Sequence, residues 1–269
     1  MDDSGLKELH KHLLVMMDEI HQICIDNNIH YSLMGGTLIG ALRHKGFIPW
    51  DDDLDIGMMW DDYQKFISVV KEMNHEWLEF EIPNENNTVI WSFMKAYDSR
   101  TTFVDVLSGT AKGVFVDIFP VTYSGNSFFS SRFHFYYHHI LKALAVRKYP
   151  NFKGKSKVAD TIITNIAKIC PARFLINSIN RHYNRLNRKF KRFVSDFDGD
   201  TRGIVPANYF DNYRLYDYER RQYMGIFKAD EYLTQVWGDY MQLPPENKRV
   251  PHHIDYVNYT LPYHQYKKL

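Results

Sequence analysis

The sequence predicts an α/β or α+β protein, with helices packed against one face of a sheet. Three observations indicate this fold class. Residues 6–73 alternate between helical and extended patterns, residues 78–120 change to an apolar period of two, and residues 126–192 are again helical in pattern. This order of elements is typical of a sheet that buries one face under helices.

The chain opens with a helical pattern. Apolar residues recur every three or four positions between Leu6 and Asn27, as one buried helix face requires. A Gly-Gly pair then separates a short apolar strand from a second helix, and Asp61 or Asp62 is placed to cap a third. The expected elements are helix 6–27, strand Tyr31–Met34, helix Thr37–Arg43, strand Asp53–Met58 and a helix that ends near Met73.

The middle of the chain is first extended and then helical. Alternating apolar residues predict a mostly antiparallel meander with strands over 78–82, 89–97, 102–106 and 114–118. Two helices rich in aromatic and basic residues are expected next. They span residues 128–148 and 157–192, with a basic linker over 149–157.

Charge divides the chain into three parts. The 269 residues carry 33 Lys and Arg against 32 Asp and Glu, a net charge of +1, which argues against a globally basic nucleic-acid binder. Residues 1–120 hold 9 basic and 20 acidic residues, whereas residues 121–195 hold 15 basic residues and one acid. We expect a core over 1–120, a basic helical insertion over 121–195, and a C-terminal part over 196–269 that completes the core.

The expected compartment is the cytosol. No apolar run reaches the length of a transmembrane helix, and the first residues show no secretory signal pattern. The two cysteines, Cys24 and Cys170, lie far apart in sequence and form no CxxC pair, which favours a reduced protein.

An acidic run follows the second predicted helix. Asp53 and Asp55 are two residues apart on a predicted strand, so their carboxylates point to one face of the sheet, and Asp51 joins them if the strand begins early. Converging carboxylates repel unless a cation lies between them, and Mg²⁺ prefers oxygen ligands. The alternative, a solvated acidic turn, is what such a run most often forms.

Two further features favour a phosphoryl-transfer site over a solvated turn. Gly35, Gly36 and Thr37 lie between a strand and a helix, where backbone N–H groups can bind phosphate oxygens. Asp117 is an isolated carboxylate in the apolar run Val114–Phe119, and its burial is costly unless it is paired or binds a metal. Together the three features predict a phosphate cradle, a pair of metal ligands and a third carboxylate.

These residues carry a resemblance to a known family. Residues 35–57, GGTLIGALRHKGFIPWDDDLDIG, resemble the signature of the LicD family, and the resemblance continues in GVFVDIFP at 113–120 and WGDYMQLPP at 237–245. The fukutin-related proteins are similar in the same acidic block. The resemblance implies a nucleotidyltransferase-like mixed sheet with a basic helical insertion. It also implies that Asp53, Asp55 and Asp117 bind metal and that Gly35, Gly36 and Thr37 contact phosphates.

The family resemblance also implies an activity. LicD-type proteins transfer phosphocholine from CDP-choline to a sugar hydroxyl of a bacterial glycan such as teichoic acid, capsule or lipopolysaccharide. The expected cofactor is Mg²⁺ or Mn²⁺, with Asp117 accepting the hydroxyl proton. Arg43, His44 and Lys45 are candidates for binding the diphosphate, although a basic helix C-terminus is an equally good interpretation.

The donor head group, if it is choline, calls for aromatic side chains and an acid. Candidate contacts near the matching blocks are Trp50, Asp51, Trp237, Asp239 and Tyr240. With 16% aromatic residues in the chain, core packing is the better explanation for each of the aromatic side chains, and capping of a turn is the alternative for Asp239.

The basic insertion has a separate prediction. Its helices are rich in aromatic and basic residues and contain almost no acids, which favours peripheral binding to an anionic membrane over a solvated helical bundle. The expected place is the inner face of the membrane, where a lipid-linked acceptor would lie. No nucleic-acid partner is expected. The alternatives that stay open are transfer of ribitol or glycerol phosphate from a CDP-activated donor, and a non-catalytic protein that binds polyanions or membranes.

Overall fold

The protein was analysed as a computed structural model, which describes residues 3–83, 91–106, 109–146, 161, 165, 170–251 and 254–267. The chain divides into two compact units. The first comprises Met1–Phe80, Lys95–Pro120 and Tyr209–Leu269, and the second comprises Glu81–Met94 and Val121–Asn208. Strand β5, Ala111–Gly125, runs through both.

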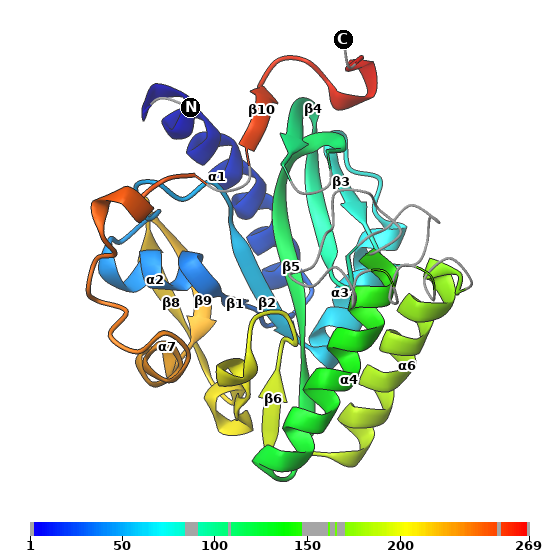
Figure 1. Cartoon of the computed structure of the whole chain (residues 1–269). Helices are drawn as coiled ribbons and strands as arrows, with labels where there is room; N and C mark the ends of the chain where they lie inside the picture. Colours follow the sequence, from blue (N-terminus) through cyan, green and yellow to red (C-terminus); the bar gives the residue numbers. More distant parts are fainter. Residues whose placement is uncertain are drawn as a thin grey trace. The chain divides into compact units, whose positions relative to one another are not determined.

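The first unit is built on a sheet with the strand order β1-β2-β5-β4-β10 and with β3 paired to β4 (Figure 1). β1 and β2 are antiparallel, as are β4 and β10. The strands are β1 Ser32–Leu33, β2 Asp55–Met59, β3 Leu78–Glu81, β4 Met94–Asp105, β5 Ala111–Gly125 and β10 Ile254–Asn258. The predicted mixed α/β fold is confirmed.

Four α-helices and a hairpin complete the described part of this unit. α1 (Asp3–Asp26) buries its apolar stripe, including Leu9, Leu13 and Ile20, as the three- and four-residue spacing predicts. α2 (Gly35–Arg43) packs on β1, β2 and β8, and α3 (Trp60–Glu72) packs on β2. The hairpin β8 (Tyr213–Tyr218) and β9 (Arg221–Ile226) lies beside β1 (Figure 1). α7 (Ala229–Trp237) follows it.

The hairpin is tied to α1 and β1 by side chains. The Arg221 guanidinium donates to the Asp18 carboxylate at 2.7 Å, and the Tyr223 hydroxyl donates to the same carboxylate at 2.7 Å. The amide of Ile226 donates to the Ser32 hydroxyl at 3.0 Å. These bonds fix the C-terminal part of the chain against the first 35 residues.

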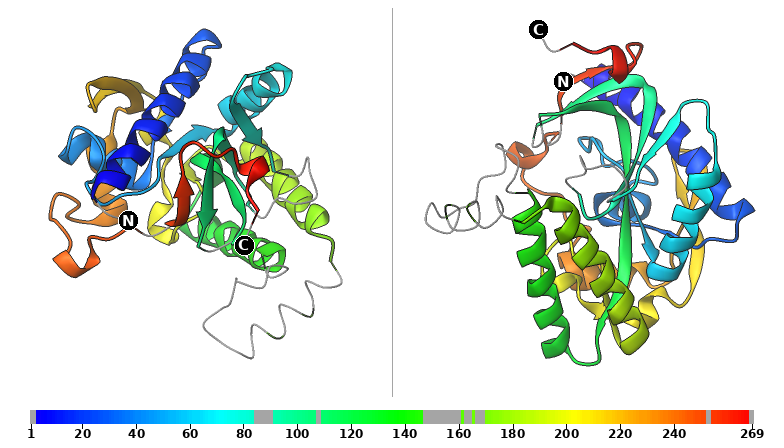
Figure 2. Two further views of the ribbon diagram at one scale, coloured as in Figure 1. Left: turned by 90° about the horizontal axis from the view of Figure 1, so that it is seen from above. Right: turned by 90° about the vertical axis from the view of Figure 1, so that its right-hand side faces the viewer.

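The second unit contains two long helices and the end of β5. α4 (Phe128–Val146) and α6 (Ala172–Lys189) lie side by side and run antiparallel, as the two views of Figure 2 also show. β6 (Phe193–Ser195) pairs with the end of β5 and with β7 (Val205–Pro206). The Asn187 side chain joins α6 to β5 through a hydrogen bond to Thr122.

Histidines, of which His138 and His182 are buried, line the contact between α4 and α6. The Tyr183 hydroxyl and His138 Nδ1 are 3.0 Å apart, and the rings of His134 and His182 lie 5.0 Å apart. Burial, and after it neighbouring positive charge, lowers the pKa of His182 to about 4. It also lowers the pKa values of His134, His138 and His139. These side chains form a neutral core at neutral pH, close to many fixed cations.

Several sequence-based boundaries were wrong. β2 begins at Asp55, so Asp53 precedes the strand, and the N-cap of α3 is Met59, with Asp61 and Asp62 in its first turn. The two strands predicted over 89–97 and 102–106 form a single strand, β4, over 94–105; residues 84–90 lie outside the described part.

The helix predicted over 157–192 was also wrong in its extent. The chain bends at Cys170, α6 begins only after Pro171, and it ends at Lys189. Proline has no N–H to donate and so starts a helix more readily than it continues one. Of the linker and helix residues predicted over 147–169, only Thr161 and Asn165 are described.

Within the described residues, no helix combines the length and the apolar character needed to cross a membrane.

Candidate active site

The glycine pair forms the first turn of α2. Gly35 has a φ of +50°, in the left-handed region that favours glycine, and its N-cap neighbour Met34 has no side-chain group bonded to the amides of that turn. The hydroxyl of Thr37 accepts a hydrogen bond from the Asp55 amide at 2.9 Å. This bond fixes the start of β2 against the start of α2.

Both glycines face carboxylates, so a larger residue at either position would have to displace one of them. A Cβ atom on Gly36 would lie 2.7 Å from Asp51 Oδ2, and one on Gly35 would lie 3.3 Å from Asp55 Oδ2. The amides at the start of α2 therefore lie close to carboxylate oxygens. Amides suit phosphate oxygens and carboxylates suit a cation that offsets the phosphate charge.

The acidic run divides between the interior and this space. Asp51, Asp53 and Asp55 are half-buried, whereas Asp52 is 2% exposed. Burial raises the pKa of Asp55 well above its usual value, and the nearby carboxylates of Asp53, Asp117 and Asp51 raise it further. The three predicted ligands thus lie near enough to interact, and the cluster carries an excess of negative charge.

Lys95 is a residue of this cluster that sequence reasoning missed. Its Nζ lies 2.5 Å from Asp117 Oδ1 and 3.7 Å from the centroid of the Phe115 ring. The side chains of Lys95 and Asp117 are 7% and 13% exposed. The sequence did contain an indication of this pair. Lys95 is the single charged residue between Ser92 and Tyr97, just as Asp117 is the single charged residue in its own apolar strand.

The donor set fits a hard divalent cation by chemistry. It consists of carboxylate oxygens beside a backbone cradle that a Cβ would fill, and it has surplus negative charge. Within the described part of the chain, however, no three His, Cys, Asp or Glu side chains already surround a common point. The ammonium of Lys95 occupies one oxygen of Asp117 in this arrangement.

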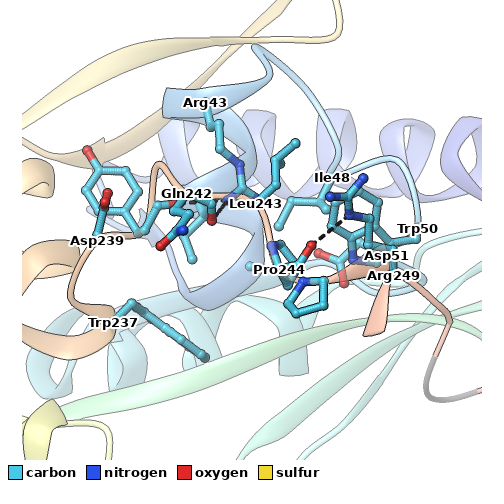
Figure 3. A pocket seen from close by; sticks show the side chains of 14 residues that line it. Arg43, Ile48, Trp50, Asp51, Trp237, Asp239, Gln242, Leu243, Pro244 and Arg249 are labelled. Atoms are coloured by element: carbon cyan, nitrogen blue, oxygen red, sulfur yellow. Dashed lines mark hydrogen bonds between the residues drawn. The ribbon is translucent and has the colours of Figure 1, made fainter. Parts of the chain in front are cut away.

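A pocket of about 610 Å³ opens next to Gly36 and Asp51 (Figure 3). One wall comes from α2 and the loop after it, through Arg43, Ile48 and Trp50. The other comes from residues 237–249. Seven of the residues predicted from sequence line it: Gly36, Arg43, Trp50, Asp51, Trp237, Asp239 and Tyr240.

The two ends of the pocket differ in chemistry. Trp237 and Asp239 lie at one end, and Trp50, Asp51 and Arg249 lie at the other (Figure 3). The Arg249 guanidinium lies 5.5 Å from the centroid of the Trp50 ring. Arg249 was not predicted, because a lone arginine in a proline-rich loop carries no distinguishing sequence pattern.

Arg43 holds the two walls together. Its Nη1 donates to the carbonyl of Tyr240 at 2.6 Å and to that of Gln242 at 3.3 Å, and its Nε donates to His44 Nε2 at 2.9 Å. The guanidinium therefore attaches the C-terminal wall to the end of α2. This positioning contact differs from the diphosphate contact expected from sequence.

The remaining predicted residues lie outside the pocket lining. Lys45 has a φ of +58°, and its carbonyl accepts from the Glu219 amide at 2.8 Å. His44 contacts Trp50 edge-on, with ring centroids 6.5 Å apart. Gly35, Thr37, Asp53, Asp55 and Asp117 form the neighbouring glycine–carboxylate space rather than the pocket wall.

Comparison with known proteins places this site in a family. Residues 28–148 match the family model described as LicD/FKTN/FKRP, nucleotidyltransferase domain. The lipopolysaccharide cholinephosphotransferase LicD of Haemophilus influenzae is 33% identical over 264 residues, which cover 93% of this chain and 96% of that protein. The chain belongs to the LicD family.

Other relatives of this LicD-family chain match over shorter segments. An uncharacterised protein of Rickettsia prowazekii is 51% identical over 59 residues, 22% of this chain and 21% of that protein. The human ribitol 5-phosphate transferase FKRP is 50% identical over 34 residues, 13% of this chain and 7% of that protein. The recognised resemblance to the LicD family is confirmed.

Proposed function

We propose that this chain is a phosphotransferase that moves phosphocholine from CDP-choline to a sugar hydroxyl of a lipopolysaccharide-type glycan and releases CMP. The observation that carries the proposal is the pocket beside Gly36, which combines tryptophans with carboxylates and opens next to the glycine–carboxylate space. Aromatic faces and nearby acids bind quaternary ammonium groups. The Haemophilus relative, named for cholinephosphate transfer to lipopolysaccharide, supports the same head group and acceptor class.

Within the pocket, we assign the choline head group to Trp237 and Asp239. Trp237 is 51% exposed and lines the pocket, with the Asp239 carboxylate two residues away. Trp50 is a poorer site for a second cation, because the Arg249 guanidinium already lies over its ring. The Tyr240 hydroxyl is used by Asp230, to which it donates at 2.5 Å.

The glycine–carboxylate space provides the groups for phosphoryl transfer. Asp53, Asp55 and Asp117 would hold Mg²⁺, which supplies charge neutralisation of the diphosphate when it is bound. The amides at the N-terminus of α2 bind phosphate oxygens. Asp117 accepts the proton of the attacking sugar hydroxyl as the new oxygen–phosphorus bond forms and the bond between that phosphorus and the CMP oxygen breaks.

The reaction is tested by measuring CMP release from CDP-choline, CDP-ribitol and CDP-glycerol, each with Mg²⁺ and with EDTA, in the presence of acceptor glycan. We expect turnover with CDP-choline that depends on Mg²⁺. Asp53→Asn should lower it by roughly a hundredfold or more, because charge neutralisation by a metal contributes several kcal/mol to the transition state. Asp61→Asn, an exposed position on α3, is the matched control. Equal turnover by wild type and Asp53→Asn would overturn the assignment.

Head-group recognition has its own test. Trp237→Ala should raise KM for CDP-choline by about two- to thirtyfold, the range expected from a lost cation–π contact of ~0.5–2 kcal/mol. It should leave turnover of a polyol donor unchanged. If the protein turned over CDP-ribitol but not CDP-choline, the head group of the donor would be a polyol and not choline. The short match to FKRP does not favour that outcome, because it covers only 7% of the ribitol transferase.

A further inference from the structure

α4 presents large apolar side chains to solvent from Phe128 to Ile140. Phe129 is 85% exposed, Phe133 64% and Ile140 61%. The exposed positions of the helix form one continuous stripe, because they recur at three- and four-residue steps. We call this set the aromatic stripe: Phe128, Phe129, Arg132, Phe133, Tyr136, Tyr137 and Ile140.

The aromatic stripe is additional to the face that α4 buries. Ser131, Phe135 and His138 on the opposite side are buried at 4% exposure or less. A helix of a soluble protein has one apolar face and one polar face, whereas α4 is apolar on both. A contiguous exposed apolar patch of this kind marks an interaction surface.

α6 adds positive charge beside the stripe. Arg181, Arg185 and Arg188 are exposed and lie on one side of the helix, and we call them the basic row. Neither α4 nor α6 contains an Asp or Glu residue. The surface cations of these two helices therefore have no acidic partners within their own helices.

The stripe and the row lie on helices that pack against each other. The rings of Tyr137 and His182 are 4.7 Å apart where the antiparallel helices meet (Figure 1). Tyr137 belongs to the stripe, and His182 is adjacent in sequence to Arg181 of the basic row. Within the stripe, the Arg132 guanidinium lies 5.8 Å from the centroid of the Tyr136 ring, so charge and aromatic surface are interleaved there as well.

The charge on this face selects among possible occupants. A second copy would bring two basic rows together, because a two-fold interface pairs identical surfaces. A nucleic acid would satisfy the arginines but leave the exposed phenylalanines in water. An anionic bilayer satisfies both sets, since aromatic and aliphatic groups enter the interface while arginines bind lipid phosphates. We propose that the aromatic stripe and the basic row dock this protein on an anionic phospholipid bilayer.

The proposal is tested by co-sedimentation of the full chain with vesicles, without donor or acceptor. One vesicle set is phosphatidylcholine alone, and the other contains phosphatidylglycerol as well. We expect binding to the anionic vesicles only. Arg181→Gln/Arg185→Gln/Arg188→Gln should weaken it roughly a hundredfold, because each basic residue near the surface contributes about fivefold. Phe129→Ser/Phe133→Ser should weaken it as well, because it removes apolar groups that enter the interface.

Matched controls separate this face from overall charge and overall hydrophobicity. Lys11→Gln/Lys65→Gln/Lys71→Gln removes the same charge from exposed positions of α1 and α3, and Leu215→Ser/Phe227→Ser removes exposed apolar groups near the β8–β9 hairpin. Both controls should bind like wild type. Equal binding to neutral and anionic vesicles would overturn the proposal. The proposal would also be overturned if the protein did not bind vesicles but self-associated or bound RNA, and if the stripe and row variants abolished that self-association or RNA binding. CMP release from donor and soluble acceptor should be unchanged in every variant, which distinguishes this test from that of the reaction.

Discussion

Replacing Lys95 by methionine tests whether the carboxylate cluster needs a cation. The substitution keeps an unbranched side chain only one atom shorter near Phe115, but it removes the ammonium 2.5 Å from Asp117. Breaking a buried ion pair by removing one partner costs about 3–5 kcal/mol, because the other charge stays buried. At ~2–4 °C per kcal/mol for a protein of this size, the melting temperature should fall by roughly 6–20 °C in EDTA.

Adding Mg²⁺ should reverse much of this loss. A ligand at a hundredfold excess over its dissociation constant stabilises the folded state by about 2.7 kcal/mol. Mg²⁺ should raise the melting temperature of the variant more than that of wild type, because in the variant the Asp117 carboxylate is no longer paired with the Lys95 ammonium. Differential scanning fluorimetry with EDTA and with MgCl₂ measures both effects. The matched control is Lys112→Met, which removes a lysine from β5, the strand that contains Asp117. The reasoning fails if Lys95→Met melts like wild type in EDTA, or if Mg²⁺ raises both proteins equally.

Three further predictions concern the cradle, the pocket wall and the helix pair. Gly36→Ala should lower kcat/KM about tenfold or more, because the new Cβ displaces the Asp51 carboxylate. The melting temperature should change little, because alanine is favourable in a helix. Steady-state kinetics and fluorimetry measure the two effects. Arg43→Gln should raise KM for the donor more than it lowers kcat, because the C-terminal wall loses charged hydrogen bonds of about 1.5–3 kcal/mol each; unchanged KM would contradict it. Acidification from pH 7 to pH 5 should lower the urea midpoint. The pKa of His182 is about 4 in the fold and near 6.5 when unfolded, so its contribution is present above pH 6.5 and is lost towards pH 4. The raised pKa values of Asp196, about 6, and of Asp55 act in the opposite direction, whereas the lowered pKa values of His134, His138 and His139 act in the same direction as that of His182. The His182→Gln variant should therefore lose less stability than wild type between pH 7 and pH 5.

Local patterns sufficed to predict the first three helices and to single out the glycines and aspartates that the structure brings near one another. Apolar spacing fixes which face of α1 is buried, and the glycine pair marks the start of α2. The strand break expected near residue 98 was wrong. β4 continues through Asp98, Ser99 and Arg100, and the Arg100 guanidinium pairs with the Asp98 carboxylate at 2.8 Å within the strand.

Other features depend on contacts that no local pattern encodes. The β8–β9 hairpin turns at Glu219 and Arg220, which have φ values of +48° and +63° without the glycine or asparagine that usually marks such a turn. The role of Lys95 depends on the alignment of β4 with β5, since only that alignment brings it to Asp117. The pocket is lined by α2 and by residues some 200 positions later in the sequence. Only the tertiary fold brings these two segments together.

The bond pattern of Arg43 has a consequence for how donor preference can change within the family. Arg43 holds the C-terminal wall through main-chain carbonyls of Tyr240 and Gln242, which residues of any type provide. The side chains of that wall, Trp237 and Asp239 among them, can therefore be exchanged without detaching the segment from α2. Under the proposed function, a chain of this design can acquire a new donor head group by substitutions in one short C-terminal stretch, while the glycines and carboxylates assigned to phosphoryl transfer stay as they are.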